Sequence, residues 1–167
     1  MSSNTGDTNM SLLRHVVATL AYWGAKMLKG APPDFPAFAI AAGTRTPVQI
    51  LAHIGDLLEW MLRLAQGTRE WKAAWKAARP SPWEDETARF FASLRALDDY
   101  LASGAPLGFP AETLFQGPLS DALTHVGQIA MLRRLAGSPV RGEVMIRADV
   151  VLGRVGPDQS PPFREFD

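Results

Sequence analysis

The chain contains no cysteine, which excludes disulfide bonds, thiolate metal ligands and a cysteine nucleophile. Its 17 basic residues balance 17 acidic residues, so no long-range field gathers nucleic acid or an anionic membrane surface, and we expect neither as a partner. No stretch approaches the roughly 20 uninterrupted apolar residues of a membrane-spanning helix. Residues Met1–Asn9 also lack the basic start and apolar run of a secretory signal. We therefore expect a soluble, cytoplasmic protein.

Three signatures of enzyme chemistry are absent as well. The sequence has no glycine-rich phosphate loop, no Gly-x-Ser-x-Gly nucleophile elbow and no His-Glu-x-x-His metalloprotease helix. These absences disfavour nucleotide-dependent enzymes and the common hydrolases. What is present is the composition of an ordinary globular domain, with 167 residues of which 47% are hydrophobic and 20% are charged. We expect a single domain, residues 1–167, built around one core.

Apolar residues recur at intervals of three and four in four long segments, which is the pattern of amphipathic helices. The first segment runs from about Thr8 to Lys29 and ends at a glycine. The second has Thr46 as a suitable N-cap and Pro47 at the first helical position, where a missing amide hydrogen costs nothing. Gly67 is a natural stop for this second helix.

The third and fourth helices also have start signals. Ser81-Pro82-Trp83-Glu84 is a capping-box arrangement, and it predicts a helix that runs to about Ser103. Pro118 opens a fourth helix that ends at Leu135 or Ala136. The sequence therefore predicts an all-α fold, in which four helices form a bundle.

The remaining segments read as connections. Residues 31–45 form a long ordered connection, and residues 69–78 form a crossover with a short helix that presents Trp71 and Trp75 on one face. The bundle then covers about residues 8–137. Residues 138–167 form an extended tail that wraps the bundle and includes a short strand or extended segment near residues 143–151.

Two of the three histidines lie within the second and fourth predicted helices, at positions 53 and 125. Asp121 precedes His125 by four residues, so their side chains rise from one helix face, roughly 5 to 6 Å apart at Cβ. His53 would add a third ligand from another helix. Two imidazoles and a carboxylate leave coordination positions open for water or substrate, so the three residues form a candidate metal site.

Each of these residues also has a more ordinary interpretation. His53 fits a hydrogen-bonded histidine at the edge of the core. Asp121 falls in the first turn of its predicted helix, where a negative side chain is favourable to the helix dipole, and it can also pair with His125. From these residues alone the ordinary interpretations are favoured over a metal site.

Two segments resemble motifs of the DinB/YfiT-like superfamily. Thr46-Pro47 followed by Ile50-Leu51-Ala52-His53-Ile54 resembles its second-helix motif. The segment from Gly117 to Ile129, leading to Leu132-Arg133-Arg134, is similar to its last-helix motif, in which a ligand pair four residues apart precedes a Gly-Gln step. The resemblance covers about residues 8–137.

This resemblance implies a four-helix bundle, often dimeric, that binds a divalent metal ion such as zinc, nickel or iron through three side chains. It assigns His53 and His125 as ligands, and Asp121 stands at a position that is often histidine. A carboxylate makes the ligand set harder and moves it toward iron(II) or manganese without excluding zinc. Some relatives use small cellular thiols as cosubstrates in transfer or isomerisation reactions.

We therefore expect a metal-dependent enzyme that acts on a small molecule, with a low-molecular-weight thiol as candidate cosubstrate, in a homodimer. The competing hypothesis is a noncatalytic dimeric bundle with a structural or binding role. Trp60 is a candidate pocket wall. Gln128 is a candidate support for a ligand, with an exposed helix glutamine as the equal alternative. His15 has no ligand-type partner at helical spacing, so it is left out of the site.

Overall fold

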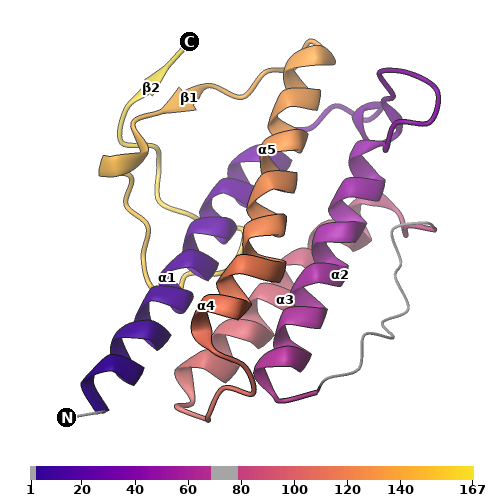
Figure 1. The fold of residues 1–167 in the computed structure, drawn as a ribbon. Helices are drawn as coiled ribbons and strands as arrows, with labels where there is room; N and C mark the ends of the chain where they lie inside the picture. The colour runs from indigo at the N-terminus through magenta and orange to yellow at the C-terminus, as the bar shows by residue number, and fades with distance from the viewer. Residues whose placement is uncertain (1–2, 69–78) are drawn as a thin grey trace.

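The computed structural model describes residues 3–68 and 79–167, and over these ranges the fold is mainly helical. The long helices are α1 (Ser3–Leu28), α2 (Pro47–Ala65), α3 (Trp83–Ala102) and α5 (Ser120–Leu135). The short elements are η1 (Phe35–Ala37), α4 (Ala111–Leu114), η2 (Phe115–Leu119), β1 (Gly142–Glu143), η3 (Met145–Arg147) and β2 (Glu165–Phe166). The all-α expectation is confirmed for the described residues (Figure 1). The expected helix around Trp71 and Trp75 lies outside them.

The long helices enclose one apolar core. α2 packs against α3 and α5, and α1 packs against the same two helices from the other side. The largest side chains that are fully buried in this core come from the long helices α1, α2 and α3 and from the segments η1, α4 and η2: Leu20, Phe35, Leu51, Ile54, Leu58, Met61, Phe90, Leu94, Leu97, Leu101, Leu114 and Leu119. Within the described ranges, no helix has both the length and the apolarity to cross a bilayer.

α2 begins and ends as its sequence predicts. Thr46 is the N-cap in extended backbone, Pro47 is the first helical residue, and the Gln49 side chain accepts a hydrogen bond from the Thr46 amide at 2.9 Å. Gly67 follows the helix with a φ of 87°, the left-handed conformation that glycine adopts without strain. This defined start fixes which face of α2 carries His53.

α3 starts one residue later than its capping-box sequence predicts. Pro82 is the N-cap, and Glu84 is exposed. The side chain that reaches back is Glu86, which is buried and accepts a hydrogen bond from the Ser81 amide at 2.9 Å. The prediction that Glu84 completes the capping box was wrong. Glu86 takes this role because it lies on the core-facing side of the helix, where its carboxylate also accepts a hydrogen bond from Arg89.

The helical backbone of the fourth long helix starts at Pro118, as the sequence predicts, because Gly117 before it has non-helical dihedral angles. A kink at Gly117 (φ −85°, ψ −106°), within the segment η2, separates α4 from the helical residues that begin at Pro118 and lead into α5. Leu114 and Leu119 on the two sides of this kink are fully buried. Their burial holds the chain on both sides of the kink, and Pro118 stands at the first helical position, where a missing amide hydrogen costs nothing.

A buried ion network joins α2 to α3. The Arg89 guanidinium donates to Glu86 at 2.8 Å, to Asp56 at 3.1 Å and to Glu59 at 3.0 Å. It also donates to the Ala52 carbonyl oxygen at 2.6 Å. Asp56 and Glu86 are almost fully buried, so Arg89 neutralises charge that water cannot reach. The network ties the helix that carries His53 to its neighbour.

Gly55 makes room for this network. A Cβ atom at this position would lie 2.5 Å from the guanidinium carbon of Arg89, closer than real Cβ contacts come. The absence of a side chain on α2 therefore lets the cation lie directly against the helix backbone, within reach of the Ala52 carbonyl oxygen.

The C-terminal tail is fastened to α1, as the expectation of a wrapping tail requires (Figure 1). β1 pairs with β2 in antiparallel register, and this ribbon brings Glu143 to α1. The Glu143 carboxylate accepts hydrogen bonds from the Tyr22 hydroxyl at 2.7 Å, from Lys26 at 3.0 Å and from the Phe163 amide at 3.1 Å. The expected strand is shorter than predicted, because the chain turns into η3 after Glu143.

Glu143→Gln is expected to destabilise the protein by about 1 to 3 kcal/mol at pH 7, because charge-assisted hydrogen bonds are lost. Burial alone would raise the pKa of Glu143, but the donors from Tyr22, Lys26 and Phe163 outweigh burial and hold this pKa below its ordinary value of 4.5. A depressed carboxylate pKa gives stability that is present above the ordinary value and is lost as the pH falls through the folded-state pKa. Urea unfolding at several pH values should therefore show the two proteins converging below about pH 4.

The control for this experiment is Glu165→Gln. Glu165 pairs with Lys26 at 2.9 Å but is 30% exposed, so its loss should cost less than about 1 kcal/mol. A stability difference between wild type and Glu143→Gln that does not change with pH would contradict the role given to the Glu143 charge.

Candidate metal centre

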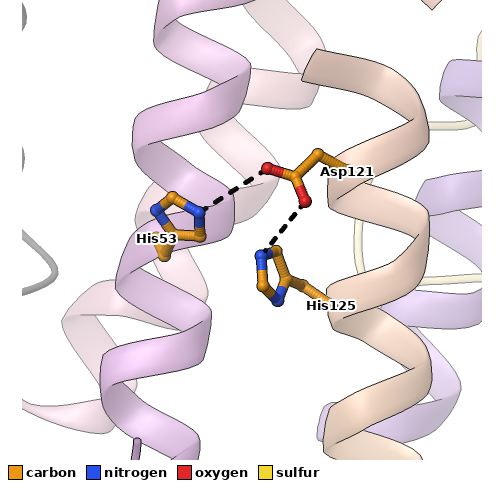
Figure 2. A group of neighbouring side chains, drawn as sticks. All are labelled: His53, Asp121 and His125. Atoms are coloured by element: carbon orange, nitrogen blue, oxygen red, sulfur yellow. Dashed lines mark ion pairs between the residues drawn. The ribbon is translucent and has the colours of Figure 1, made fainter. Parts of the chain in front are cut away.

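His53, Asp121 and His125 meet between α2 and α5, as the sequence predicts. His53 Nε2 lies 3.7 Å from Asp121 Oδ2, and His125 Nε2 lies 3.3 Å from Asp121 Oδ1. The two imidazole rings have their centroids 4.7 Å apart at 80°. Figure 2 shows the three side chains pointing toward one another. One ligand atom from each residue lies within 4.8 Å of the others, so the three are close enough to hold a metal ion.

Helical register places these side chains. On α2, His53 lies beside the buried Ile50 and Ile54, at the edge of the face that packs against the other helices. On α5, Asp121 and His125 are one turn apart, and the buried Ala122 anchors the same turn. Because α2 packs directly against α5, the two helix faces bring their polar side chains together.

The three side chains differ in their exposure to solvent. The side chains of His53 and His125 are 16% and 11% exposed, whereas that of Asp121 is 47% exposed. The imidazoles therefore form the floor of the cluster and the carboxylate forms its rim. A cation held between them would remain within reach of water or a small molecule from the side of Asp121.

The spacing of the donor atoms fits a shared ion. With metal–nitrogen and metal–oxygen bonds of about 2.0 to 2.2 Å, two ligands of one ion lie about 3.0 to 3.5 Å apart. The His125–Asp121 separation of 3.3 Å falls in this range, and the His53–Asp121 separation of 3.7 Å is just outside it. An ion shared by all three residues would therefore require His53 to move toward Asp121.

The electrostatic surroundings favour neutral His53. Burial lowers the pKa of this histidine, and the neighbouring His125 and the positive charge of Arg45 lower it further. Asp121 and Asp56 act in the opposite direction without reversing the shift. Neutral imidazole is the form that binds a metal ion, so less proton release is needed at this position than at an ordinary histidine.

His125 has a second polar partner. Its Nδ1 lies 2.9 Å from the side-chain oxygen of Gln128, three residues later on α5. Sequence reasoning placed Gln128 near the ligands but left its role open, and the structure gives it a contact with one of them. Arg45 was missed. Its sequence signal is its position eight residues before His53, about two helical turns, next to the start of α2.

The structure also places His15, on α1, and Trp60, on α2. His15 is exposed on α1 and lines a shallow surface hollow with Leu12 and Leu152, so leaving it out of the site is consistent with the structure. Trp60 is partly buried and packs against the core. Neither residue belongs to the group of side chains that can share one ion.

The cluster combines two imidazoles with one carboxylate, a borderline-to-hard donor set that accommodates zinc, iron(II), nickel or manganese. Three protein donors leave further coordination positions for water or substrate. The assignment rests on this geometry alone, since comparisons with protein-family models, with curated proteins and with solved structures gave no match to this chain.

Proposed function

We propose that this chain is a DinB/YfiT-like four-helix bundle that binds one divalent metal ion through His53, Asp121 and His125 and acts as a metal-dependent enzyme on a small molecule. The observation that carries the proposal is the convergence of three ligand-type side chains from two helices within 4.8 Å. The resemblance of the flanking motifs supports the same three residues. A cytoplasmic location and a homodimeric state belong to this proposal.

The chemistry follows from the donor set. A bound divalent ion lowers the pKa of a coordinated water or thiol and supplies a nucleophile near neutral pH. His53 and His125 hold the ion from the less exposed side, and Asp121 holds it at the solvent-facing rim. Because the chain has no cysteine, a thiol-dependent transfer or isomerisation would use a low-molecular-weight thiol from outside.

A second candidate function is favoured by one observation. Asp121 lies between the two histidines at ion-pair distances, so the cluster links α2 to α5 even without a metal ion. This arrangement fits a noncatalytic dimeric bundle in which the polar cluster is structural. The two functions can be told apart by the coordination of the ion. An enzyme requires an open coordination position for water or substrate, whereas a structural cluster does not.

Elemental analysis after chelation and reconstitution is expected to give about one ion per chain, as three converging ligands require. The protein would be reloaded separately with zinc, nickel, iron(II) and manganese. With manganese bound, enhanced relaxation of solvent water protons is expected, because an open position exchanges water. Failure to retain any of the four ions would contradict the metal proposal, and a bound ion without exchangeable water would favour the structural function.

A further inference from the structure

The hydrogen bond between His125 and Gln128 bears on which ring nitrogen can bind a metal ion. A neutral imidazole carries its hydrogen on one nitrogen and a lone pair on the other, and the partner of the first decides the choice. An amide oxygen only accepts hydrogen bonds. With the Gln128 oxygen 2.9 Å from Nδ1, this contact is a hydrogen bond only when the hydrogen of His125 is on Nδ1. The lone pair then lies on Nε2.

Nε2 is also the nitrogen that faces the cluster. It lies 3.3 Å from Asp121 Oδ1, so a lone pair on Nε2 points at a carboxylate oxygen. Two lone pairs at this distance repel one another unless a positive charge lies between them. In the opposite tautomer Nε2–H would donate to Asp121, and the nitrogen would be closed to a metal ion.

We propose that Gln128 is a positioning residue that holds His125 in the Nδ1-protonated tautomer and so keeps Nε2 open for a cation. The part of this inference that concerns metal affinity rests on the proposed function, whereas the tautomer is a property of the metal-free protein. Ligand histidines in metal sites commonly donate their second N–H to an oxygen in this way, which fixes the orientation of the ring.

The position of Gln128 makes it a clean site for substitution. It is exposed on α5, outside the core, and within the described part of the chain its side chain makes this one hydrogen bond. Methionine has a similar length and helix propensity but no acceptor oxygen. Glutamate keeps an acceptor oxygen and adds charge. Gln116 is exposed in η2, five residues before Asp121, and provides a control outside the cluster.

The tautomer is measured by NMR on metal-free protein with ¹⁵N-labelled histidine at about pH 8, where an ordinary histidine is neutral. In the wild type, Nδ1 of His125 is expected to carry the hydrogen and Nε2 to show the signal of a bare nitrogen. Gln128→Met should shift His125 toward the Nε2-protonated form, and Gln128→Glu should preserve the wild-type tautomer. A wild-type protein already protonated on Nε2 would overturn the inference, since the amide nitrogen of Gln128 would then face the ring.

Zinc affinity, measured by competition with a chelating dye, tests the consequence. Gln128→Met is expected to weaken zinc binding by about 10- to 100-fold, and Gln128→Glu to bind at least as tightly as wild type. Gln116→Met should bind zinc like the wild type, and all variants should keep the helical circular dichroism and melting temperature of the parent. A changed tautomer with unchanged affinity would overturn the positioning role. Absence of zinc binding by the wild type would instead overturn the metal proposal, and the NMR result would still decide the tautomer.

Discussion

His125→Ala is expected to lower zinc affinity by at least about 100-fold, because the loss of a direct ligand costs no less than the loss of the residue that supports it. His125 Nε2 is the nitrogen closest to Asp121, at 3.3 Å, and its ring is held on the second side by Gln128. Without it, only one imidazole and one carboxylate remain. Isothermal titration of metal-free protein with zinc measures the change directly.

Two variants separate loss of binding from loss of structure. His125 is largely buried, so its removal also affects packing, whereas Asp121 is half exposed and Asp121→Asn keeps the side-chain volume. Asp121→Asn should therefore lose most of the zinc affinity while melting like the wild type. His15→Ala, at the exposed histidine outside the cluster, should bind zinc normally. Wild-type metal content in His125→Ala would rule out the ligand assignment.

Arg89→Met is expected to destabilise the fold by about 3 to 5 kcal/mol, which is the cost of leaving buried charges without their partner. Asp56 and Glu86 are 2% and 1% exposed, and Arg89 bonds to both. Without the guanidinium, these two carboxylates would face each other across a region that water does not reach. Urea unfolding followed by circular dichroism gives the difference in the free energy of unfolding.

Arg141→Met is the matched control for this substitution. Arg141 pairs with Asp167 at 3.1 Å, but both side chains are mostly exposed, so its loss should change the free energy of unfolding by less than about 1 kcal/mol. If the two arginine variants were equally stable, the Arg89 network would contribute no more than an ordinary surface ion pair.

Features that depend on residue spacing within one helix could mostly be predicted from the sequence. The periodic apolar residues located the long helices, and the spacing of Asp121 and His125 placed both on one face of α5. The residues alone left the meeting with His53 less favoured than the ordinary interpretations, because residues 53 and 125 are far apart in sequence, and only the resemblance of the flanking motifs favoured it. A contact between two helices produces no periodic pattern in the sequence of either helix.

Features that depend on tertiary packing were missed for the same reason. Asp56 and Glu86 interrupt apolar stripes, and their common partner Arg89 cannot be identified from local pattern. The two-residue strands are too short to show alternation.

His53 and Asp56 stand three residues apart on α2, so the candidate metal ligand and an anchor of the Arg89 network share one turn of helix. The contacts of Asp56 with α3 therefore bear on the position of the helical turn that carries the His53 imidazole. A variant that weakens the packing between α2 and α3 should consequently have a lower metal affinity, although all three ligand residues are unchanged. Affinity at the cluster would then report on a contact made on the opposite side of the same helix.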